Sequence, residues 1–228
     1  MTFGVTPARV APVGPAEPPP DCPLCPRLVA FRDACRLRDP AGYNAPVRSF
    51  GPATARLLVV GLAPGRDGAN HSGRPFTGDW AGDLLYETLA LAGFAAGTYA
   101  ERPDDDLALV DCMVTNAVRC VPPANKPVPA EIATCRTFLS ERMAGLPELR
   151  AVLALGRIAH ESVVRTLGAK LSAVPFGHGR SHALAHGGRP VTLFDSYHCS
   201  RYNTNTGVLT AEMFRAVFAE VRRFVDAG

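Results

Sequence analysis

Leu57-Leu58-Val59-Val60-Gly61 is a short apolar run that passes directly into a glycine-rich loop, Gly61-Leu62-Ala63-Pro64-Gly65. A continuous apolar run of this length predicts a strand that is buried on both faces. Outward from it, further apolar runs occupy residues 107–115, 151–155 and 191–194. Helical patterns follow the four runs at residues 81–94, 130–143, 158–167 and 211–225. The alternation predicts an α/β fold with a central, mostly parallel four-stranded sheet and helices on both faces.

The chain has 228 residues, and its first 20 carry six of the 21 prolines with almost no periodic apolar pattern. We expect residues 1–20 to form a flexible proline-rich leader, because they cannot bury enough apolar surface to become ordered. Residues 21–228 then make a single domain, which opens with a helical pattern after Cys25.

Composition excludes some classes of protein. With 47% hydrophobic residues, the chain has material for a core, which excludes wholesale disorder. The net charge of +3 is too small to indicate nucleic-acid binding by itself. The excess of 22 arginines over two lysines is consistent with phosphate binding, and equally with the codon bias of a GC-rich genome. The longest uncharged stretch, residues 88–100, is shorter than the ~18 residues of a membrane span. Without a secretory pattern at the start, we expect a cytoplasmic, monomeric protein with no membrane partner.

Seven cysteines in a reducing compartment favour metal binding or catalysis over disulfides. Cys22 and Cys25 form a C-x2-C pair, and Cys120 and Cys135 form a second, wider pair. Together they make a four-cysteine metal site, and their spacing leaves zinc and a [4Fe–4S] cluster both open. The other three, Cys35, Cys112 and Cys199, are expected to be buried small residues, with Cys35 as a weaker alternative ligand.

Three unusual polar loops, residues 61–79, 116–125 and 198–205, each follow a predicted strand. The carboxyl ends of parallel strands meet at one edge of a sheet, where ligands bind. Neither a P-loop nor a G-x-G-x-x-G motif is present, which disfavours nucleotide sites. His198, at a strand end amid Ser, Asn and Arg, is the best catalytic histidine. The others are expected to be surface or structural: His71, His160, His178, His182 and His186. Residues 104–106, all aspartate, are expected to form a solvated loop.

With these loops in hand, the chain resembles the family 5 (type B) iron–sulfur uracil-DNA glycosylases of the uracil-DNA glycosylase superfamily, from Cys22 to the last helix. The match is carried by the strings GLAPGRDGANHSGRPFTGD, NAVRCVPPANKPVPAE, LGRIA and SYHCSRYNTNTG. The resemblance implies excision of deaminated bases from DNA, with a range broader than uracil that includes hypoxanthine and xanthine. It also implies a [4Fe–4S] cluster on Cys22, Cys25, Cys120 and Cys135.

The resemblance further implies catalytic roles for Asp79, Asn125 and His198. Leu62 stands where family 4 enzymes carry an acidic residue, which fits family 5. Asn116 corresponds to the base-reading asparagine of other glycosylase families, although members of family 5 can lack it.

A glycosylase must flip its base out of the duplex and break the bond from C1′ to the base nitrogen. We expect His198 to donate a hydrogen bond to the leaving base. Asp79 would stabilise the cationic sugar and orient water, which Asn125 would help to hold. Phe76 would stack on the flipped base, unless it is simply a core aromatic, and the backbone of Gly61, Leu62 and Ala63 would bond to that base.

Three residues after His198 are candidates for contacts with DNA, or for an ordinary solvated turn: Arg201, Tyr202 and Asn203. A Schiff-base mechanism needs an amine, and of the two lysines only Lys126 lies near a motif. We therefore expect a monofunctional hydrolase, with a cluster that is structural. The alternatives are a non-catalytic iron–sulfur or zinc module that binds DNA or senses damage, and a redox protein that transfers electrons through the cluster.

Overall fold

The computed structural model of the protein describes residues 16–227. Its helices are α1 (Pro26–Arg38), α2 (Ala69–Ser72), α3 (Trp80–Leu91), α4 (Pro129–Ala144), α5 (Arg157–Thr166), α6 (Arg201–Asn205) and α7 (Ala211–Asp226), with a 3₁₀ turn, η1 (Pro123–Asn125). Its strands are β1 (Leu57–Gly61), β2 (Ala95–Ala96), β3 (Ala108–Leu109), β4 (Cys112–Asn116), β5 (Ala151–Leu155), β6 (Ser181–His186) and β7 (Arg189–Ser196).

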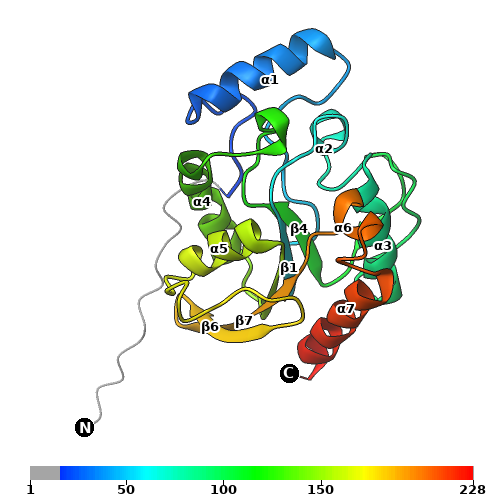
Figure 1. The fold of residues 1–228 in the computed structure, drawn as a ribbon, viewed down its shortest axis with the longest axis vertical. Helices are drawn as coiled ribbons and strands as arrows, with labels where there is room; N and C mark the ends of the chain where they lie inside the picture. The colour runs from blue at the N-terminus through cyan, green and yellow to red at the C-terminus, as the bar shows by residue number, and fades with distance from the viewer. Residues whose placement is uncertain (1–15, 228) are drawn as a thin grey trace.

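The main sheet has five strands in the order β4-β1-β5-β7-β6. β1 pairs in parallel with β4 and β5, and β5 pairs in parallel with β7. Figure 1 shows α3 and α7 on one side of this sheet, α4 and α5 on the other, and α1 at one end of the molecule. The predicted α/β class, with four parallel strands between helical layers, is confirmed.

β1 shows why the two helical layers form. All five of its residues are buried, and alternate side chains point to opposite faces of the sheet. Leu57 and Val59 pack in the cluster that includes residues of α3 and α7, whereas Leu58 and Val60 pack in the cluster that includes residues of α4 and α5. The apolar run therefore supplies the centre of two cores, one on each face.

The prediction of four strands missed β6, which pairs antiparallel with β7 at the edge of the sheet. None of the side chains of β6 is buried, so the strand carries no apolar run. The turn between β6 and β7 is Gly187-Gly188, and both residues have positive φ, as two-residue hairpin turns require. The pair of glycines was the available signal for this hairpin.

The single strand expected at residues 107–115 is divided into β3 and β4. Asp111, between them, has a φ of 55°, which breaks an extended strand. Its carboxylate pairs with Arg56 at 2.5 Å, which fixes the break against the start of β1. β3 then pairs with β2 in a separate two-stranded ribbon beside α3.

Residues 1–15 of the expected leader (residues 1–20) lie outside the part of the chain that the structure describes. Residues 16–20 depart from that expectation because Glu17 is packed onto the domain. Its carboxylate accepts hydrogen bonds from Arg119 at 2.9 Å and Arg142 at 2.6 Å, and from the backbone N–H of Ser49. The paired charges were not visible to a composition argument. Within residues 16–227, no helix has the length and apolar character needed to cross a membrane.

Candidate active site

A pocket of about 290 Å³ opens at the carboxyl ends of β1, β4 and β7. The three predicted catalytic side chains, Asp79, Asn125 and His198, all line it, although they come from three separate loops. The other lining residues are Leu62, Ala63, Pro64, Gly65, Ala69, Phe76, Trp80, Ala81, Asn116, Ser200 and Arg201.

Asp79 is the N-cap residue of α3, so one carboxylate oxygen is fixed by the helix. Its Oδ1 accepts hydrogen bonds from the backbone N–H groups of Ala81 at 3.1 Å and Gly82 at 3.3 Å. Its Oδ2 lies beside Gly65 and Gly68, where an added Cβ would come within 3.2 and 2.7 Å of it. Burial raises the pKa of Asp79 above its usual value, against the opposing effect of the two N–H groups. The site therefore holds an oriented carboxylate, and its Oδ2 accepts no hydrogen bond from residues 16–227.

His198 follows β7, and burial lowers the pKa of its imidazole to about 4. The ring is therefore neutral at pH 7, with one N–H to donate. Neither ring nitrogen is hydrogen-bonded by another side chain or backbone group of residues 16–227. The ring lies nearly parallel to Phe76, with the ring centroids 6.0 Å apart and an interplanar angle of 28°. The imidazole is thus available to a ligand in the pocket.

Phe76 is buried and takes a left-handed backbone conformation, with a φ of 54°. Such a φ is strained for an aromatic residue and persists only where the surroundings impose it. At Gly82 of α3, an added Cβ would meet the Phe76 carbonyl oxygen at 1.9 Å, so only glycine fits there. The first turn of α3 is thereby pressed against the loop that carries Phe76 and Asp79.

Hydrogen bonds to successive carbonyl groups hold this loop in place. The hydroxyl of Tyr86 donates to Pro75 O at 2.5 Å, and that of Tyr99 donates to Phe76 O at 3.2 Å. Ser72 donates to the carbonyl of Thr77 at 2.9 Å. All three donors come from segments outside residues 75–77, so the strained conformation is fixed from several directions.

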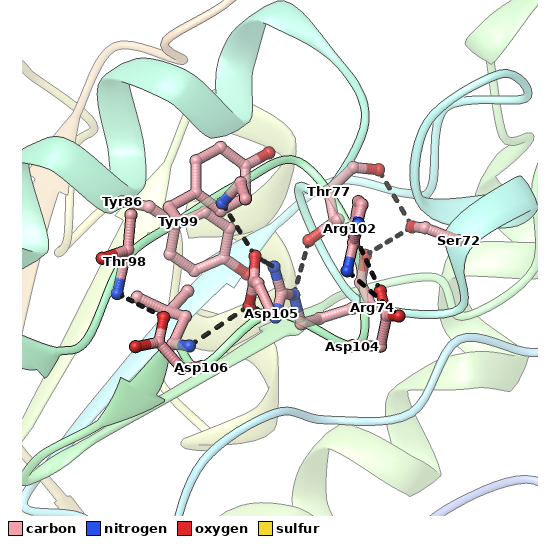
Figure 2. A network of polar contacts seen from close by, with 12 residues as sticks. Ser72, Arg74, Thr77, Tyr86, Thr98, Tyr99, Arg102, Asp104, Asp105 and Asp106 are labelled. Atoms are coloured by element: carbon pink, nitrogen blue, oxygen red, sulfur yellow. Dashed lines mark hydrogen bonds and ion pairs between the residues drawn. The ribbon is translucent and has the colours of Figure 1, made fainter.

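Beneath these bonds lies a buried ion pair between Arg74 and Asp105, shown in Figure 2. The two nitrogens Nη1 and Nη2 of Arg74 contact the two carboxylate oxygens at 2.6 and 2.7 Å. Nε of Arg74 donates to Thr77 at 2.8 Å, and its guanidinium lies 5.1 Å from the ring centroid of Phe50. Asp105 also accepts from two backbone N–H groups, and the hydrogen bond from Arg74 holds its pKa far below the usual value.

The expectation that residues 104–106 form a solvated loop is therefore wrong at Asp105. Its side chain is only 3% exposed, whereas Asp104 is exposed and pairs with Arg102. Asp106 accepts from the backbone N–H of Thr98, which shapes the same loop. Three adjacent aspartates look alike in the sequence, and the tertiary contact with Arg74, 31 positions earlier, distinguishes the middle one.

Asn116 lines the pocket, and Gly61 lies beside it as its partner in the pairing of β1 with β4. Asn116 ends β4 and is buried; an added Cβ on Gly61 would come within 2.5 Å of its Oδ1 and of the Phe76 ring. Gly61 itself does not line the pocket, and its carbonyl accepts from the N–H of Ala117. The absence of a side chain at Gly61 thus lets Asn116 and Phe76 approach β1. Leu62 and Ala63, which follow it, line the pocket.

Asn125 and α6 border the open side of the pocket. Asn125 is exposed and left-handed, with a φ of 55°. Arg201 and Tyr202 are exposed too, and Arg201 alone of the three predicted DNA contacts lines the pocket. Asn203 instead donates from its side-chain amide to the carbonyl of His198 at 2.8 Å. This bond holds the turn after β7, so Asn203 positions the loop that carries His198.

The four predicted metal ligands lie together at the N-terminal end of α1. Cys22, Cys25, Cys120 and Cys135 line one small pocket of about 20 Å³. Burial and the proximity of Cys135 raise the pKa of the Cys120 thiol to about 12. The backbone N–H of Arg119 donates to Cys135 Sγ at 3.3 Å. In the described part of the chain, no three His, Cys, Asp or Glu side chains have the geometry for one metal ion.

The other three cysteines are buried, as expected. Among the remaining histidines, His160 is fully buried and contacts Asp195 at 2.7 Å, so its role is structural.

Comparison with known proteins decides the family. The uracil DNA glycosylase superfamily matches residues 48–222. A Type-5 uracil-DNA glycosylase of Thermus thermophilus is 46% identical over 207 residues, which cover 89% of this chain and 93% of the relative. The Type-5 enzyme of Pyrobaculum aerophilum is 37% identical over 91% of this chain and 90% of its own length. A Type-4 uracil-DNA glycosylase of Archaeoglobus fulgidus is 29% identical, over 67% of this chain and 69% of its own.

This chain belongs to the uracil-DNA glycosylase superfamily. The resemblance to family 5 is thereby confirmed, and so is the predicted enzyme class. As a glycosylase, the protein brings eight of its predicted catalytic, base-binding and DNA-binding residues to one pocket, and leaves Gly61, Tyr202 and Asn203 outside its lining.

Sequence reasoning missed two features of this glycosylase site. Trp80 lines the pocket next to Asp79, and no role was predicted for it from the sequence. Its position directly after the predicted catalytic aspartate was the available signal. Tyr86 and Tyr99, which hold the Phe76 loop, gave no signal because they lie on other segments.

Proposed function

We propose that the protein hydrolyses the N-glycosidic bond of uracil, and of other deaminated bases such as hypoxanthine and xanthine, in DNA. The observation that carries this proposal is the meeting of Asp79, Asn125 and His198 in one pocket against the buried Phe76. Membership of the superfamily supports it. DNA with a deaminated base is thus the partner, and the base enters the pocket by flipping out of the duplex.

The pocket suits a planar base that stacks on Phe76. Its ring is held by a fixed backbone, so stacking does not require the loop to become ordered on binding. Three of the lining residues, Ala63, Gly65 and Ala69, have small side chains or none, which leaves room for purines as well as uracil. This supports a range that includes hypoxanthine and xanthine.

His198 would stabilise the base as it leaves with negative charge. A neutral imidazole donates one N–H, and its pKa of about 4 keeps it neutral throughout the physiological range. A fixed donor in a site that excludes water stabilises such charge by ~3–4 kcal/mol. The absence of an internal partner for the ring among residues 16–227 leaves that N–H for the base.

Asp79 would face the sugar, where positive charge develops. Oδ1 is held by two N–H groups of α3, so Oδ2 is the oxygen that orients or deprotonates water. Asn125, exposed at the mouth, would help to hold that water. Since the pKa of Asp79 is raised, activity should fall with acid at a higher pH than an ordinary aspartate would give.

The reaction would be monofunctional. Neither Lys126 nor Lys170 is among the residues that line the pocket, so no lysine is placed to form a Schiff base with the sugar. Water is then the nucleophile, and an abasic site is the product.

The four clustered cysteines fit a [4Fe–4S] cluster. Each thiolate of such a cluster binds a different iron, so the sulfurs need not converge on one point as they do around a zinc ion. When bound, the cluster would cross-link the chain before α1 to the loop after β4 and to α4. The same junction contains a bidentate pair of Arg27 with Glu131, both contacts at 2.8 Å. A structural role follows, because α1 has only a small apolar cluster of its own.

The proposed cluster is tested by removing iron with a chelator. We expect the thermal unfolding temperature and the rate of uracil release to fall together. Cluster-free protein that stays fully stable and active would contradict the structural role.

The activity is tested with labelled duplexes that contain one uracil, hypoxanthine or xanthine. We expect strand breaks only after alkali treatment, because a monofunctional enzyme leaves the abasic strand intact. Breaks without alkali would contradict that mechanism. No product from any substrate, despite binding, would refute the activity and favour a non-catalytic DNA-binding module.

A further inference from the structure

Trp80 stands at the mouth of the pocket with a large exposed aromatic surface. It is the only tryptophan in the chain and the residue directly after Asp79. Its exposed fraction is 46%, although it lines the same pocket as Asp79 and His198. A core residue would be covered, so packing does not explain a tryptophan here.

Two contacts orient the indole. Its Nε1 donates to the hydroxyl of Thr204 at 3.1 Å, and the guanidinium of Arg201 lies 5.0 Å from the ring centroid. Both partners come from α6, the helix that follows His198. The indole is therefore held by a hydrogen bond at its edge and a cation–π contact on one face, while part of its surface stays open.

The charge of Arg201 has no carboxylate beside it within residues 16–227. Two other exposed arginines are neutralised locally, Arg66 by Asp67 and Arg102 by Asp104, at 2.8 and 3.0 Å. A guanidinium with five donors stacks on an aromatic face and still binds a phosphate at its edge. The pair of Trp80 and Arg201 thus offers a flat apolar surface next to an unpaired positive charge.

We propose that Trp80 and Arg201 form a subsite for the nucleotide that neighbours the flipped one: Trp80 stacks on its base, and Arg201 binds its phosphate. This inference rests on the proposed function. When a base leaves the stack, the neighbouring base loses its covering on one side. An aromatic side chain at the mouth of the pocket restores that covering, and the phosphate next to it is anionic at every pH of interest.

Stacking is measured directly, because Trp80 supplies all of the tryptophan fluorescence. The probe is a duplex that contains a tetrahydrofuran analogue of an abasic site, which the enzyme cannot cleave. We expect saturating DNA to quench the fluorescence, since a base would stack on the indole. An emission spectrum that is unchanged at saturation would overturn the proposal.

The neighbouring base is then removed from the DNA, on the 5′ side in one duplex and on the 3′ side in another. Affinities are measured for the wild-type protein and for Trp80→Leu, with Leu91→Ala as the matched control on an exposed position of the same helix. Wild-type affinity should fall about 5- to 150-fold for one of the two duplexes, the range expected for one stacked base. Trp80→Leu should show little or no further loss for that duplex, and Leu91→Ala should behave as wild type.

The contrary outcome is a Trp80→Leu protein that loses the same factor on all three duplexes, or loses nothing. An equal loss would mean that Trp80 only shapes α6 and does not stack. The unfolding temperature is recorded for each variant. Trp80→Phe keeps an aromatic ring, so removal of the neighbouring base should still lower its affinity, by a smaller factor than for the wild-type protein. Uracil release by the wild-type protein is scored separately, so a protein that releases none refutes the proposed function, whereas equal losses refute the subsite.

Discussion

The two sides of the pocket are built differently. We call residues 73–79 the wall, and Trp80, Asn125 and residues 200–205 the rim. The wall carries Phe76 and Asp79 and rests on the buried pair of Arg74 and Asp105. Hydrogen bonds from outside the loop reach three consecutive carbonyl groups, those of residues 75–77. The rim is more open to solvent: Arg201 and Tyr202 are exposed, and the exposed fraction of Tyr202 is 73%.

The difference follows from what each side must do. Groups that act on a transition state have to be held in place beforehand, because reorganisation at that moment raises the barrier. Groups that meet a flexible polymer need an accessible surface and tolerate movement. The wall therefore suits chemistry and the rim suits binding, which the following changes should separate.

The largest effect is expected in the wall, from Asp79→Asn. Asparagine keeps the N-cap hydrogen bonds to α3, so stability should change little while the negative charge is lost. We expect the single-turnover rate of uracil release to fall about 10²- to 10⁴-fold. Affinity for DNA with an abasic analogue should stay near the wild-type value. An unchanged rate of uracil release in Asp79→Asn would show that the carboxylate of Asp79 takes no part in the reaction.

Asp105→Ala should damage the wall from beneath. It leaves the guanidinium of Arg74 buried without its partner, which costs about 3–5 kcal/mol in the free energy of unfolding. Chemical denaturation measures the loss, and excision should fall as well because Phe76 loses its support. Asp104→Ala is the matched control, since its exposed pair with Arg102 contributes at most ~1 kcal/mol. Equal losses from the two variants would show that the buried pair does not hold the wall.

A smaller effect, confined to binding, is expected in the rim. Arg201→Ala removes one phosphate contact, so the slope of log affinity against log salt should decrease by about 1. The rate at saturating DNA should be unchanged, because Arg201 does not act on the reacting atoms. Arg165→Ala, on the exposed side of α5, serves as control. A reduced rate with unchanged salt dependence would show that Arg201 acts in the reaction and not in phosphate binding.

The smallest effect concerns the pH dependence of stability, through the buried His160. Burial lowers the pKa of His160, but the hydrogen bond and charge of Asp195 act together with the hydrogen bond to the Val174 carbonyl and the charge of Glu161, so the net pKa is above the usual value. Its stabilising contribution is complete below the unfolded-state pKa of about 6.5 and is lost as pH rises through the higher folded-state value. The free energy of unfolding should decline over that window, and His160→Gln should flatten the decline. A wild-type profile identical to that of the variant would contradict this assignment.

The parts of the fold that could be predicted are those whose sequence pattern is local. Leu57–Gly61 and Ala151–Leu155 are fully buried strands, and their apolar runs coincide with the observed bounds. β6 was missed because its side chains are half exposed, so no apolar pattern marks it. Edge strands of this kind depend on a hairpin turn and a partner strand.

The pocket could be predicted because parallel strands bring their carboxyl ends to one edge, which places loops far apart in sequence together. The contacts that hold residues 73–79 in place could not be predicted from the sequence. Asp105 looks like its neighbours until Arg74 is brought to it by the fold, and the exposed Trp80 differs from a core residue only in three dimensions.

The central claim is that the pocket removes uracil by stabilising the departing base. The most direct measurement is the single-turnover rate of uracil release from a duplex, for the wild-type protein and for His198→Ala, with affinity for the abasic analogue measured alongside. The account predicts release by the wild type, a rate about 10²- to 10³-fold lower for the variant, and nearly equal affinities. Equal rates for the two proteins, or no release by the wild type, would contradict it.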